Sequence, residues 1–360
     1  MTTKRERRDS TAEPYFSICI PQYNRTSFLI AALRSFERQD FRSFEICISD
    51  DVSNDGREDE VVRELENCGI PYCYVRQATN LRYDGNLRAA ISLARGTYCL
   101  LMGNDDGLSD AGALRRLAEL LHKHRQPGVA VANYRDAESG AVYQRTTGTK
   151  IVEGNPASAI DNFRNFSFVS GVLIRRDLAH RNATIHLDGS EMYQVYLVTR
   201  AMAEGENLLQ IDDVMIDKDL RIPGESVDSY AAKPKLDPCP IEPRKFNLVQ
   251  FPRVVSDAIS ASVPAESIDE YNTRILDQLY SYTYPYWLVE FRRVQSWKYA
   301  LGIALGQRPA EMTRGLKLSK LGAVRIRVKY TLSTLAGLLV PVRFTQKVVA
   351  PLMYRRAKRS

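Results

Sequence analysis

The chain has 360 residues, of which 44% are hydrophobic, so it is long enough for one large domain or two and too apolar for global disorder. Its net charge of +7 is concentrated at one end, because residues 312–360 hold twelve Lys or Arg and no Asp or Glu. The other 38 basic and 43 acidic residues leave residues 1–311 at −5. The basic charge is therefore a C-terminal property, and it predicts an acidic partner there only.

Several functional classes lack their sequence motif. The six cysteines include no CxxC pair and the four histidines no HExxH spacing, so neither a disulfide framework nor a zinc site is indicated. No GxxxxGK[ST] or GxGxxG sequence follows the first apolar run, which argues against a kinase, an ATPase or a dehydrogenase. No RNA- or DNA-binding motif accompanies the basic tail, so we expect no nucleic-acid partner.

Strand-like and helix-like segments alternate from residue 15 onward. Short apolar runs predict strands at 15–21, 44–51, 72–77, 97–103 and 129–134. Apolar residues at helical spacing predict helices at 25–39, 58–70, 84–96 and 109–124, the last capped by Ser109. Weaker patterns predict strands at 166–178 and 207–216 and a helix at 190–205 capped by Ser190. The alternation indicates a largely parallel sheet covered by helices on both faces.

The chain divides into four regions by composition. We expect a disordered basic leader at 1–14, an α/β domain at 15–225, a Pro-rich linker at 226–265 and a helical, amphipathic, basic region at 266–360. The longest uncharged run of the tail, Tyr330–Val342, has 13 residues, short of the roughly 20 needed to span a bilayer. The tail therefore suits an anionic membrane surface, although it could instead pack as a helical subdomain on the rest of the chain.

Polar residues follow three of the predicted strands, in the segments Pro21–Asn24, Asp50–Asp55 and Gly103–Asp106. Because ligands bind beyond the carboxyl ends of such strands, these segments are the candidate site. Asp50 could accept hydrogen bonds from a base or a sugar. Asp105 could bind a hard divalent cation, which would neutralise a leaving diphosphate. Acidic pairs after strands are also common as solvated turns and Asx-type caps, so both interpretations stay open at this point.

The ordered set of segments resembles the GT-A fold, family 2 glycosyltransferases, which take a sugar from a nucleoside diphosphate and invert its anomeric centre. The segment FSICIPQYNRTSFLIAALRSF is similar to the opening strand and PxYN turn of that family. FEICISDDVSNDG is similar to its nucleobase-binding strand end, and NLRYDGNLRAAISLARGTYCLLMGNDD to the segment that leads into its DxD motif. The resemblance covers residues 15–135 well and 165–220 weakly. It implies a Rossmann-like mixed α/β sheet flanked by helices, and the LLGxDD subgroup implies O-antigen, capsule or exopolysaccharide assembly.

The resemblance also implies the site residues. Those expected at the donor nucleotide are Pro21, Tyr23, Asn24, Asp50, Asp51, Asn80, Asp84, Asn86 and Asn104. The expected ligands of Mn²⁺ or Mg²⁺ are Asp105 and Asp106. Gly103 replaces the first acid of the common motif, so metal binding depends chiefly on Asp105, with Asp106 supporting the loop or the acceptor.

An inverting transfer needs a base that takes the proton from the acceptor hydroxyl. The acidic pair that supplies this base in the family falls near Tyr193–Gln194, where the chain has no acid. The nearest carboxylates are Glu191 and Asp188. We favour Glu191, expected in the first turn of its helix, with Asp188 second and His186 third.

Together with the basic tail, the resemblance thus implies a metal-dependent, inverting glycosyltransferase, peripheral at the cytoplasmic face of a bacterial membrane. Its expected donor is a UDP-sugar and its expected acceptor a polyprenyl-diphosphate-linked saccharide. Two alternatives remain. A catalytically inactive scaffold of a glycan-assembly complex is compatible with Gly103 and the missing acidic pair. A sugar nucleotidyltransferase would ordinarily show a loop rich in Gly and in Arg or Lys after the first strand, which PQYNRTS does not supply.

Overall fold

A computed structural model describes residues 2–7, 12–225, 247–294 and 296–341. The chain forms two compact units. The first, called here the sheet unit, comprises residues 1–155 and 164–232, and the second, the helical unit, comprises residues 156–163 and 233–360. Each is described by itself.

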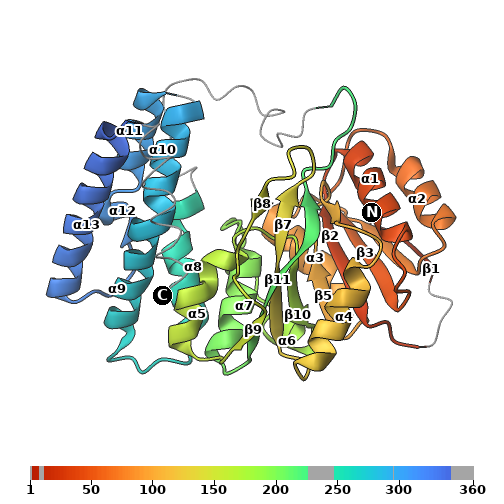
Figure 1. The fold of residues 1–360 in the computed structure, drawn as a ribbon, viewed down its shortest axis with the longest axis horizontal. Helices are drawn as coiled ribbons and strands as arrows, with labels where there is room; N and C mark the ends of the chain where they lie inside the picture. Colours follow the sequence, from red (N-terminus) through yellow and green to blue (C-terminus); the bar gives the residue numbers. More distant parts are fainter. Residues whose placement is uncertain (1, 8–11, 226–246, 295, 342–360) are drawn as a thin grey trace. The chain divides into compact units, whose positions relative to one another are not determined.

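The sheet unit is built on one mixed sheet (Figure 1). Its strands follow the order β1 (Thr3–Arg7), β4 (Tyr72–Arg76), β3 (Phe44–Asp50), β2 (Phe16–Gln22), β5 (Tyr98–Leu101), β10 (Val172–Arg175), β7 (Val129–Asp136), β11 (Leu208–Lys218) and β6 (Gly107–Leu108). In addition, β8 (Val142–Tyr143) pairs with β7, and β9 (Lys150–Val152) pairs with β11. Neighbours among β2 to β5 run parallel, as the alternation predicts, whereas β1, β6 and β10 are antiparallel to the strands beside them.

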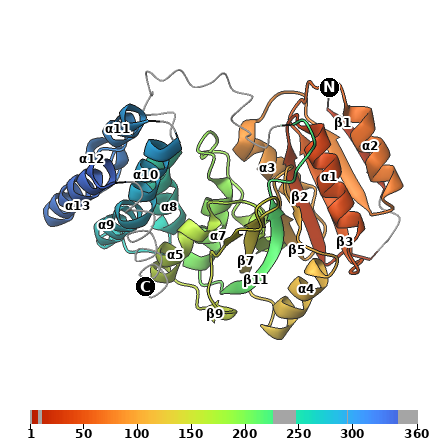
Figure 2. The same ribbon diagram turned by 45° about the horizontal axis from the view of Figure 1, so that its top comes forward.

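Helices cover both faces of the sheet (Figure 2). The helices α1 (Thr26–Glu37), α2 (Glu58–Asn67) and α4 (Ala113–Lys123) share one core with alternate strand residues such as Ile18 and Ile46. On the opposite face lie α3 (Arg82–Ser92), α6 (Arg176–Arg181) and α7 (Tyr193–Ala203). The residues that follow Ile18 and Ile46, Cys19 and Cys47, are buried free thiols. The alternation of side chains along a strand divides the two cores.

The register of the parallel strands fixes the position of the candidate site. Gln22 at the end of β2 lies beside Asp50 at the end of β3. Leu101 at the end of β5 lies level with Cys19, and the next residue, Met102, donates its backbone N–H to the Cys19 carbonyl. The loops after the three strands therefore leave the sheet at the same edge.

The predicted disordered leader is wrong for residues 3–7. These residues form β1, the edge strand of the sheet, which pairs with β4. Without β1, the backbone groups of β4 on that side would lack partners. The Arg7 guanidinium adds hydrogen bonds to the carbonyls of Glu66 and Ile70. Long-range pairing of this kind leaves no periodic signal in a short polar segment.

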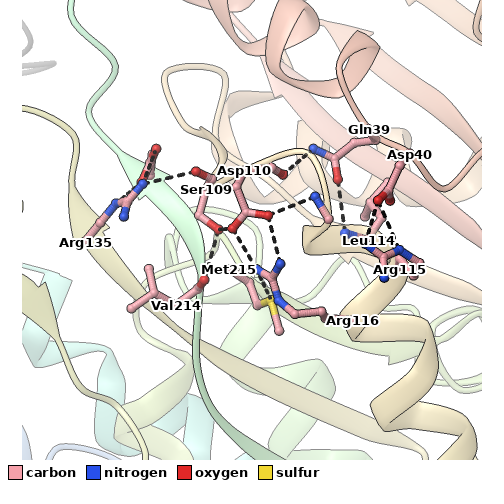
Figure 3. A network of polar contacts seen from close by, with 12 residues as sticks. Gln39, Asp40, Ser109, Asp110, Leu114, Arg115, Arg116, Arg135, Val214 and Met215 are labelled. Atoms are coloured by element: carbon pink, nitrogen blue, oxygen red, sulfur yellow. Dashed lines mark hydrogen bonds and ion pairs between the residues drawn. The ribbon is translucent and has the colours of Figure 1, made fainter.

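The helix predicted at 109–124 begins at Ala113, and the residue that organises its start is Asp110 (Figure 3). The Asp110 carboxylate accepts from the Gly112 N–H at 2.8 Å and pairs with Arg116 at 2.7 Å. The Arg116 guanidinium lowers the pKa of Asp110 to about 2. Ser109, the predicted cap, donates instead to the carbonyl of Val214. This network joins the start of α4 to β11 and has a structural role.

Two further predictions differ from the structure. The segment predicted as a strand at 166–178 contributes only the four residues of β10 before α6 begins. Within the predicted linker, residues 226–246 lie outside the described residues, but 247–249 form a 3-10 helix and Phe251–Ser260 form helix α8. The helix α8 buries Phe251 and Val255, so the helical region begins earlier than the proline-based boundary indicated.

The expected C-terminal helical extension is present in the helical unit. This unit contains α5 (Pro156–Asn162), α8, α9 (Ile268–Gln278), a π-helical turn (Leu279–Thr283), α10 (Tyr284–Val294), α11 (Trp297–Gly306), α12 (Pro309–Met312) and α13 (Lys320–Leu339). Tyr280, Leu288 and Ile303 are fully or almost fully buried among them. Across the described ranges, no helix combines the length and the apolar character needed to cross a membrane. The last part of the predicted basic tail, 342–360, lies outside the described residues.

Candidate active site

The end of β2 connects the three loops of the candidate site. The Gln22 side chain is fully buried; its Nε2 donates to the Asn24 carbonyl at 2.7 Å and its Oε1 accepts from Asn104 Nδ2 at 2.8 Å. The Gln22 carbonyl accepts from Asn86 Nδ2 at 3.0 Å and from the Asp51 N–H at 2.8 Å. Asn24, Asn86 and Asn104, all expected at the donor, are therefore brought together by a residue that the sequence did not single out.

Asp50 lies at the end of β3 beside a cleft of about 220 Å³. The cleft is lined by Thr26, Asp50, Ser53, Asp55, Gly56, Arg57, Glu58, Asp59, Val61 and Arg76. One carboxylate oxygen of Asp50 accepts from the Tyr74 hydroxyl and the other from the Ser53 N–H, both at 2.7 Å. Burial raises the pKa of Tyr74 far above its usual value, which keeps that hydroxyl a donor. Each carboxylate oxygen retains a second lone pair, so Asp50 could also accept from a ligand N–H.

Asp51 and Asn80 hold the loop before α3. Asp51 is 3% exposed, and its Oδ1 accepts from the Leu81 N–H at 2.5 Å. The Asn80 amide donates to the Asp51 carbonyl at 3.2 Å. Burial raises the pKa of Asp51. These two residues fix the backbone that borders the site. They therefore support the site indirectly, whereas direct contact with the donor was expected.

Pro21 and Tyr23 occupy opposite environments in the β2 turn. Pro21 pairs with Ser49 within the parallel register of β2 and β3. The Tyr23 side chain is 47% exposed. Tyr23 is thus available to an aromatic or sugar ring at the edge of the site, whereas Pro21 shapes the strand end.

Asp105 forms an ion pair with Arg25, a residue that the sequence did not single out. The Arg25 Nη1 lies 2.6 Å from Asp105 Oδ2, and the two side chains are only 20% and 19% exposed. The guanidinium also lies 4.2 Å from the centre of the Phe28 ring. Asn24 and Arg25 both adopt left-handed backbone conformations, with φ of 52° and 58°. Consecutive non-glycine residues in this region are uncommon and tend to occur at functional sites.

Asp106, in contrast, points into the protein. Its Oδ2 bonds to the Ser170 hydroxyl at 2.5 Å and its Oδ1 accepts from the Asp219 N–H at 2.9 Å. Burial, and then the negative charge of Asp105, raises the pKa of Asp106 to about 8. A side chain at Gly103 would place its Cβ 3.0 Å from a carboxylate oxygen of each aspartate, which gives a physical reason for glycine where the family often has an acid.

The residues present fit a divalent cation that takes one carboxylate from the protein and its other oxygens from a ligand and water. Asp105, with Asn104 beside it, can supply that carboxylate if Arg25 yields its place. Asp106 fits less well, because both of its oxygens are engaged and burial raises its pKa. Among the described residues, no cluster of three or more His, Cys, Asp or Glu side chains could hold a metal by itself.

Asp84, expected at the donor, is bonded to backbone groups of the turn before α7. It is 1% exposed, and its carboxylate accepts from the backbone N–H groups of Gly189, Glu191 and Tyr193 at 2.8 to 3.0 Å. Asp84 therefore holds the turn that leads into α7. Asn86 stays a donor-site candidate, because its Oδ1 is buried and has no partner among the described residues. An orphaned amide oxygen of this kind fits a ligand or water donor.

The three candidate bases lie in the turn before α7. The prediction that Glu191 occupies the first helical turn is wrong, because Met192 is the N-cap and Glu191 precedes it with a φ of 58°. The exposed Asp188 carboxylate binds the Arg88 guanidinium through both oxygens, at 2.5 and 2.8 Å. His186 contacts the Thr184 hydroxyl. Glu191, whose backbone N–H is held by Asp84, stays the favoured candidate, with Asp188 second and His186 third, as the sequence predicts.

The residues that sequence reasoning missed fall into two groups. Gln22 and Arg25 lie within the PQYNR segment itself, so the same strand-end position that drew attention to Asn24 could have found them. Tyr74 and Ser170 lie in segments without any motif, and only the strand pairing brings them to Asp50 and Asp106.

Comparisons with known proteins concern the family and the fold of the chain. Residues 17–180 match the family described as Glycosyl transferase family 2. A stretch of 95 residues is 42% identical to abequosyltransferase RfbV of Salmonella typhimurium, covering 26% of this chain and 28% of that protein. A stretch of 108 residues is 32% identical to the GalNAc(5)-diNAcBac-PP-undecaprenol beta-1,3-glucosyltransferase of Campylobacter jejuni, covering 29% of this chain and 34% of that one. The chain thus spans about a third or less of the length of these two curated relatives.

The similarity to solved structures extends over both units of the chain. The structure of S. aureus TarS residues 1–349 in complex with UDP-GlcNAc has a TM-score of 0.59 and 17% identity, and the likeness covers 90% of each chain. The complex of the same protein with UDP gives a TM-score of 0.58 and 16% identity. At identities this low, the similarity establishes the fold alone. That fold is a mixed α/β sheet flanked by helices and followed by a helical extension.

Proposed function

We propose that this protein, whose residues 17–180 match glycosyl transferase family 2, transfers a sugar from a nucleoside-diphosphate donor to a glycan acceptor. The donor we expect first is a UDP-sugar, because the S. aureus structure of similar fold is a complex with UDP-GlcNAc. The acceptor we propose is a polyprenyl-diphosphate-linked saccharide of a bacterial surface glycan. The Campylobacter relative, whose name refers to undecaprenol, supports that choice.

The observation that carries this proposal is the hydrogen-bonded chain between Asp50 and Asp105. Asp50 accepts from the Ser53 N–H, and the Ser53 hydroxyl accepts from the Asn24 N–H at 2.8 Å. Asn24 in turn contacts Asn104, the neighbour of Asp105, through its carbonyl. A group that can bind a base and a group that can bind a cation are thereby held at one edge of the sheet, as a nucleoside diphosphate requires.

A bound Mn²⁺ or Mg²⁺ would supply a Lewis acid that offsets the charge of the leaving diphosphate. Asp105 would hold it, with Asn104 beside it. Asp50 accepts a base N–H at the cleft, and the orphaned Asn86 oxygen accepts a donor from the ligand. Asp106 keeps the loop closed through Ser170 and Asp219.

The acceptor enters from the side of the turn before α7. Glu191 takes the proton from the attacking hydroxyl as the bond to the anomeric carbon forms and the bond to the diphosphate breaks, with inversion. Asp84 fixes the Glu191 backbone by accepting its N–H at 2.8 Å. Asp188, bound by Arg88, orders the same turn.

The nucleotide panel UDP, dTDP, GDP and CDP, titrated calorimetrically with and without Mn²⁺, tests the donor site. Wild type, Asp105→Ala and the matched control Glu119→Ala, whose side chain is 64% exposed on α4, would be compared. We expect one nucleotide to bind tightly only when both the metal and Asp105 are present. Absence of binding by every nucleotide to folded wild type would refute the proposal.

A catalytically inactive scaffold is the second candidate, because no acid stands at Tyr193 or Gln194 and Asp188 is paired. Radiolabelled sugar transfer to a lipid-linked acceptor distinguishes the two. Metal-dependent nucleotide binding without transfer of any sugar would favour the scaffold. Transfer that is lost in Glu191→Gln would favour the enzyme and its proposed base.

A further inference from the structure

The last described helix, α13, turns large apolar side chains away from its own core. Six residues on one face are Leu321, Val324, Val328, Leu332, Leu335 and Leu339, with side chains 51% to 80% exposed. We call them the outer stripe. In the helical unit α13 lies at an edge, and α9 and α10 pack against one side of it (Figure 1). Single exposed leucines are ordinary, but six on one helical face form a contiguous apolar surface that needs an explanation.

The face of α13 opposite the outer stripe packs against the rest of the helical unit. Gly322, Ile326 and Gly337 are buried there. An added Cβ would lie 2.5 Å from the Thr273 hydroxyl oxygen at Gly322 and 2.9 Å from Leu288 Cδ1 at Gly337. The two glycines thus allow α13 to pack closely against α9 and α10. The inner face is complete without the outer stripe, so the stripe is not explained by packing within the described residues.

The spacing of the outer stripe favours a flat partner. Successive members are three, four, four, three and four residues apart, which follows the 3.6-residue period of a straight helix. A left-handed coiled coil would need a 3.5-residue repeat. With a rise of about 1.5 Å per residue, the stripe runs about 27 Å along one straight line. A straight apolar line between polar flanks suits the plane of a bilayer surface.

The charges beside the stripe favour an anionic partner. Lys320 and Arg327 flank it on one side, and Arg325 and Lys329 on the other. The last two also pair with Asp277 of α9 at 3.0 and 2.6 Å, yet the Arg325 side chain stays 63% exposed. No Asp or Glu occurs from residue 312 to the end. A second copy bound through the same face would bring like charges together, whereas an anionic surface would neutralise them.

An aromatic residue lies beside the same helix. Trp297, at the start of α11, is 50% exposed, and its indole N–H donates to the Leu338 carbonyl near the end of α13. Tryptophan is enriched at membrane interfaces because its ring is apolar and its N–H is polar. It therefore adds an interfacial group to the C-terminal end of the stripe.

We propose that the outer stripe of α13 docks the protein on an anionic phospholipid bilayer, with the helix parallel to the surface. This deepens the proposed function and rests on it in one respect: a lipid-linked acceptor would be reached from that surface. It assigns the docking to α13 within the described residues rather than to the basic tail as a whole.

Vesicle binding by the full chain tests the proposal. The probes are vesicles of phosphatidylglycerol and phosphatidylcholine in equal parts, and vesicles of phosphatidylcholine alone. We expect wild type to bind the anionic vesicles at least tenfold more tightly. We expect Leu332→Gln with Leu335→Gln to weaken that binding at least tenfold. The matched control, Val142→Gln with Ile151→Gln on exposed positions of β8 and β9, is expected to bind as wild type.

Two further measurements keep the result interpretable. The only tryptophans, Trp287 and Trp297, both lie in the helical unit, so a blue shift of their fluorescence on anionic vesicles would report contact there. The variant Lys320→Gln with Arg327→Gln leaves the stripe intact. We expect it to weaken binding to the anionic vesicles and not to the phosphatidylcholine vesicles. It tests the proposal even if the leucine variant does not fold.

Three outcomes would overturn the proposal. The first is anionic-vesicle binding that the leucine variant does not change. The second is absence of vesicle binding by wild type. The third is a wild-type dimer in sedimentation velocity that the same variant dissociates, which would assign the stripe to a second copy. The nucleotide titration in solution separates the docking proposal from the proposed function. If the protein binds a nucleotide in a metal-dependent way but does not bind vesicles, the docking is refuted and the donor site is not.

Discussion

The sheet unit buries carboxyl groups and the helical unit exposes apolar surface, and each departure has a different explanation. Asp50, Asp84 and Asp106 are at most 2% exposed, and every one of them receives hydrogen bonds from loops that it holds in place. Leu321, Leu332 and Leu339 are at least 63% exposed. Buried polar groups are explained by partners inside the protein, whereas an exposed apolar stripe indicates a partner outside it.

The largest effect on activity is expected for Asp105→Ala. Asp105 differs from the buried acids of the site, because its side chain is paired with Arg25 and is still partly exposed. We expect kcat/KM for sugar transfer to fall at least about 100-fold, equivalent to about 2.7 kcal/mol, with little change in Tm. Steady-state assays and thermal unfolding measure the two quantities. A fall in Tm that matches the loss of activity would place Asp105 among the structural acids instead.

Asp84→Ala should act mainly on stability. It removes the acceptor for three backbone N–H groups at the start of α7, which we expect to lower the free energy of unfolding by about 3 kcal/mol. Asp84→Asn retains one carbonyl oxygen and should lose less. Urea denaturation measures both variants. Equal stability of Asp84→Ala and wild type would mean that water replaces the carboxylate.

Asp106 predicts a pH dependence of stability in the absence of added metal. Its folded-state pKa of about 8 lies above the usual 3.8, so the contribution of the neutral form is complete below pH about 4 and is lost as the pH rises through 8. Relative to Asp106→Asn, wild type should lose at most about 1.4 kcal/mol per pH unit across that window. Denaturation curves between pH 5 and 9 measure this difference. Parallel curves for the two proteins would contradict it.

Arg25→Ala should expose the competition at Asp105. The guanidinium occupies one carboxylate oxygen, so its removal should strengthen Mn²⁺ binding in the absence of nucleotide about fivefold, or about 1 kcal/mol. The electron paramagnetic resonance signal of free Mn²⁺ gives the affinity directly. Arg34→Ala, on the exposed side of α1, is the matched control. Weaker Mn²⁺ binding by Arg25→Ala would show that Arg25 supports the cation site.

The smallest effect is expected for Leu332→Gln on the outer stripe. The free energy of unfolding should change by no more than about 0.5 kcal/mol, because the side chain is 63% exposed. Leu33→Ala, at a fully buried position of α1, should lose about 3 kcal/mol. Chemical denaturation compares the two. A large loss for Leu332→Gln would mean that the chain itself covers the stripe.

The amino-acid sequence determined what depends on local periodicity. The alternation of apolar runs and helical spacing placed β2 to β5 and the helices between them, and parallel strands share an edge, so Asp50 and Asp105 were expected at one site. The same local information separated the helical region, although prolines put its boundary too late.

Only the tertiary structure decided what depends on contacts between distant segments. Asp84 is bonded to residues more than a hundred positions away, and Asp106 is bonded to Ser170 and Asp219. The pairing of Thr3–Arg7 with β4 and the ion pair of Arg25 with Asp105 are likewise long-range. Spacing along the chain carries no record of such partners, because they are selected by strand pairing and by the need to satisfy buried polar groups once the sheet has formed.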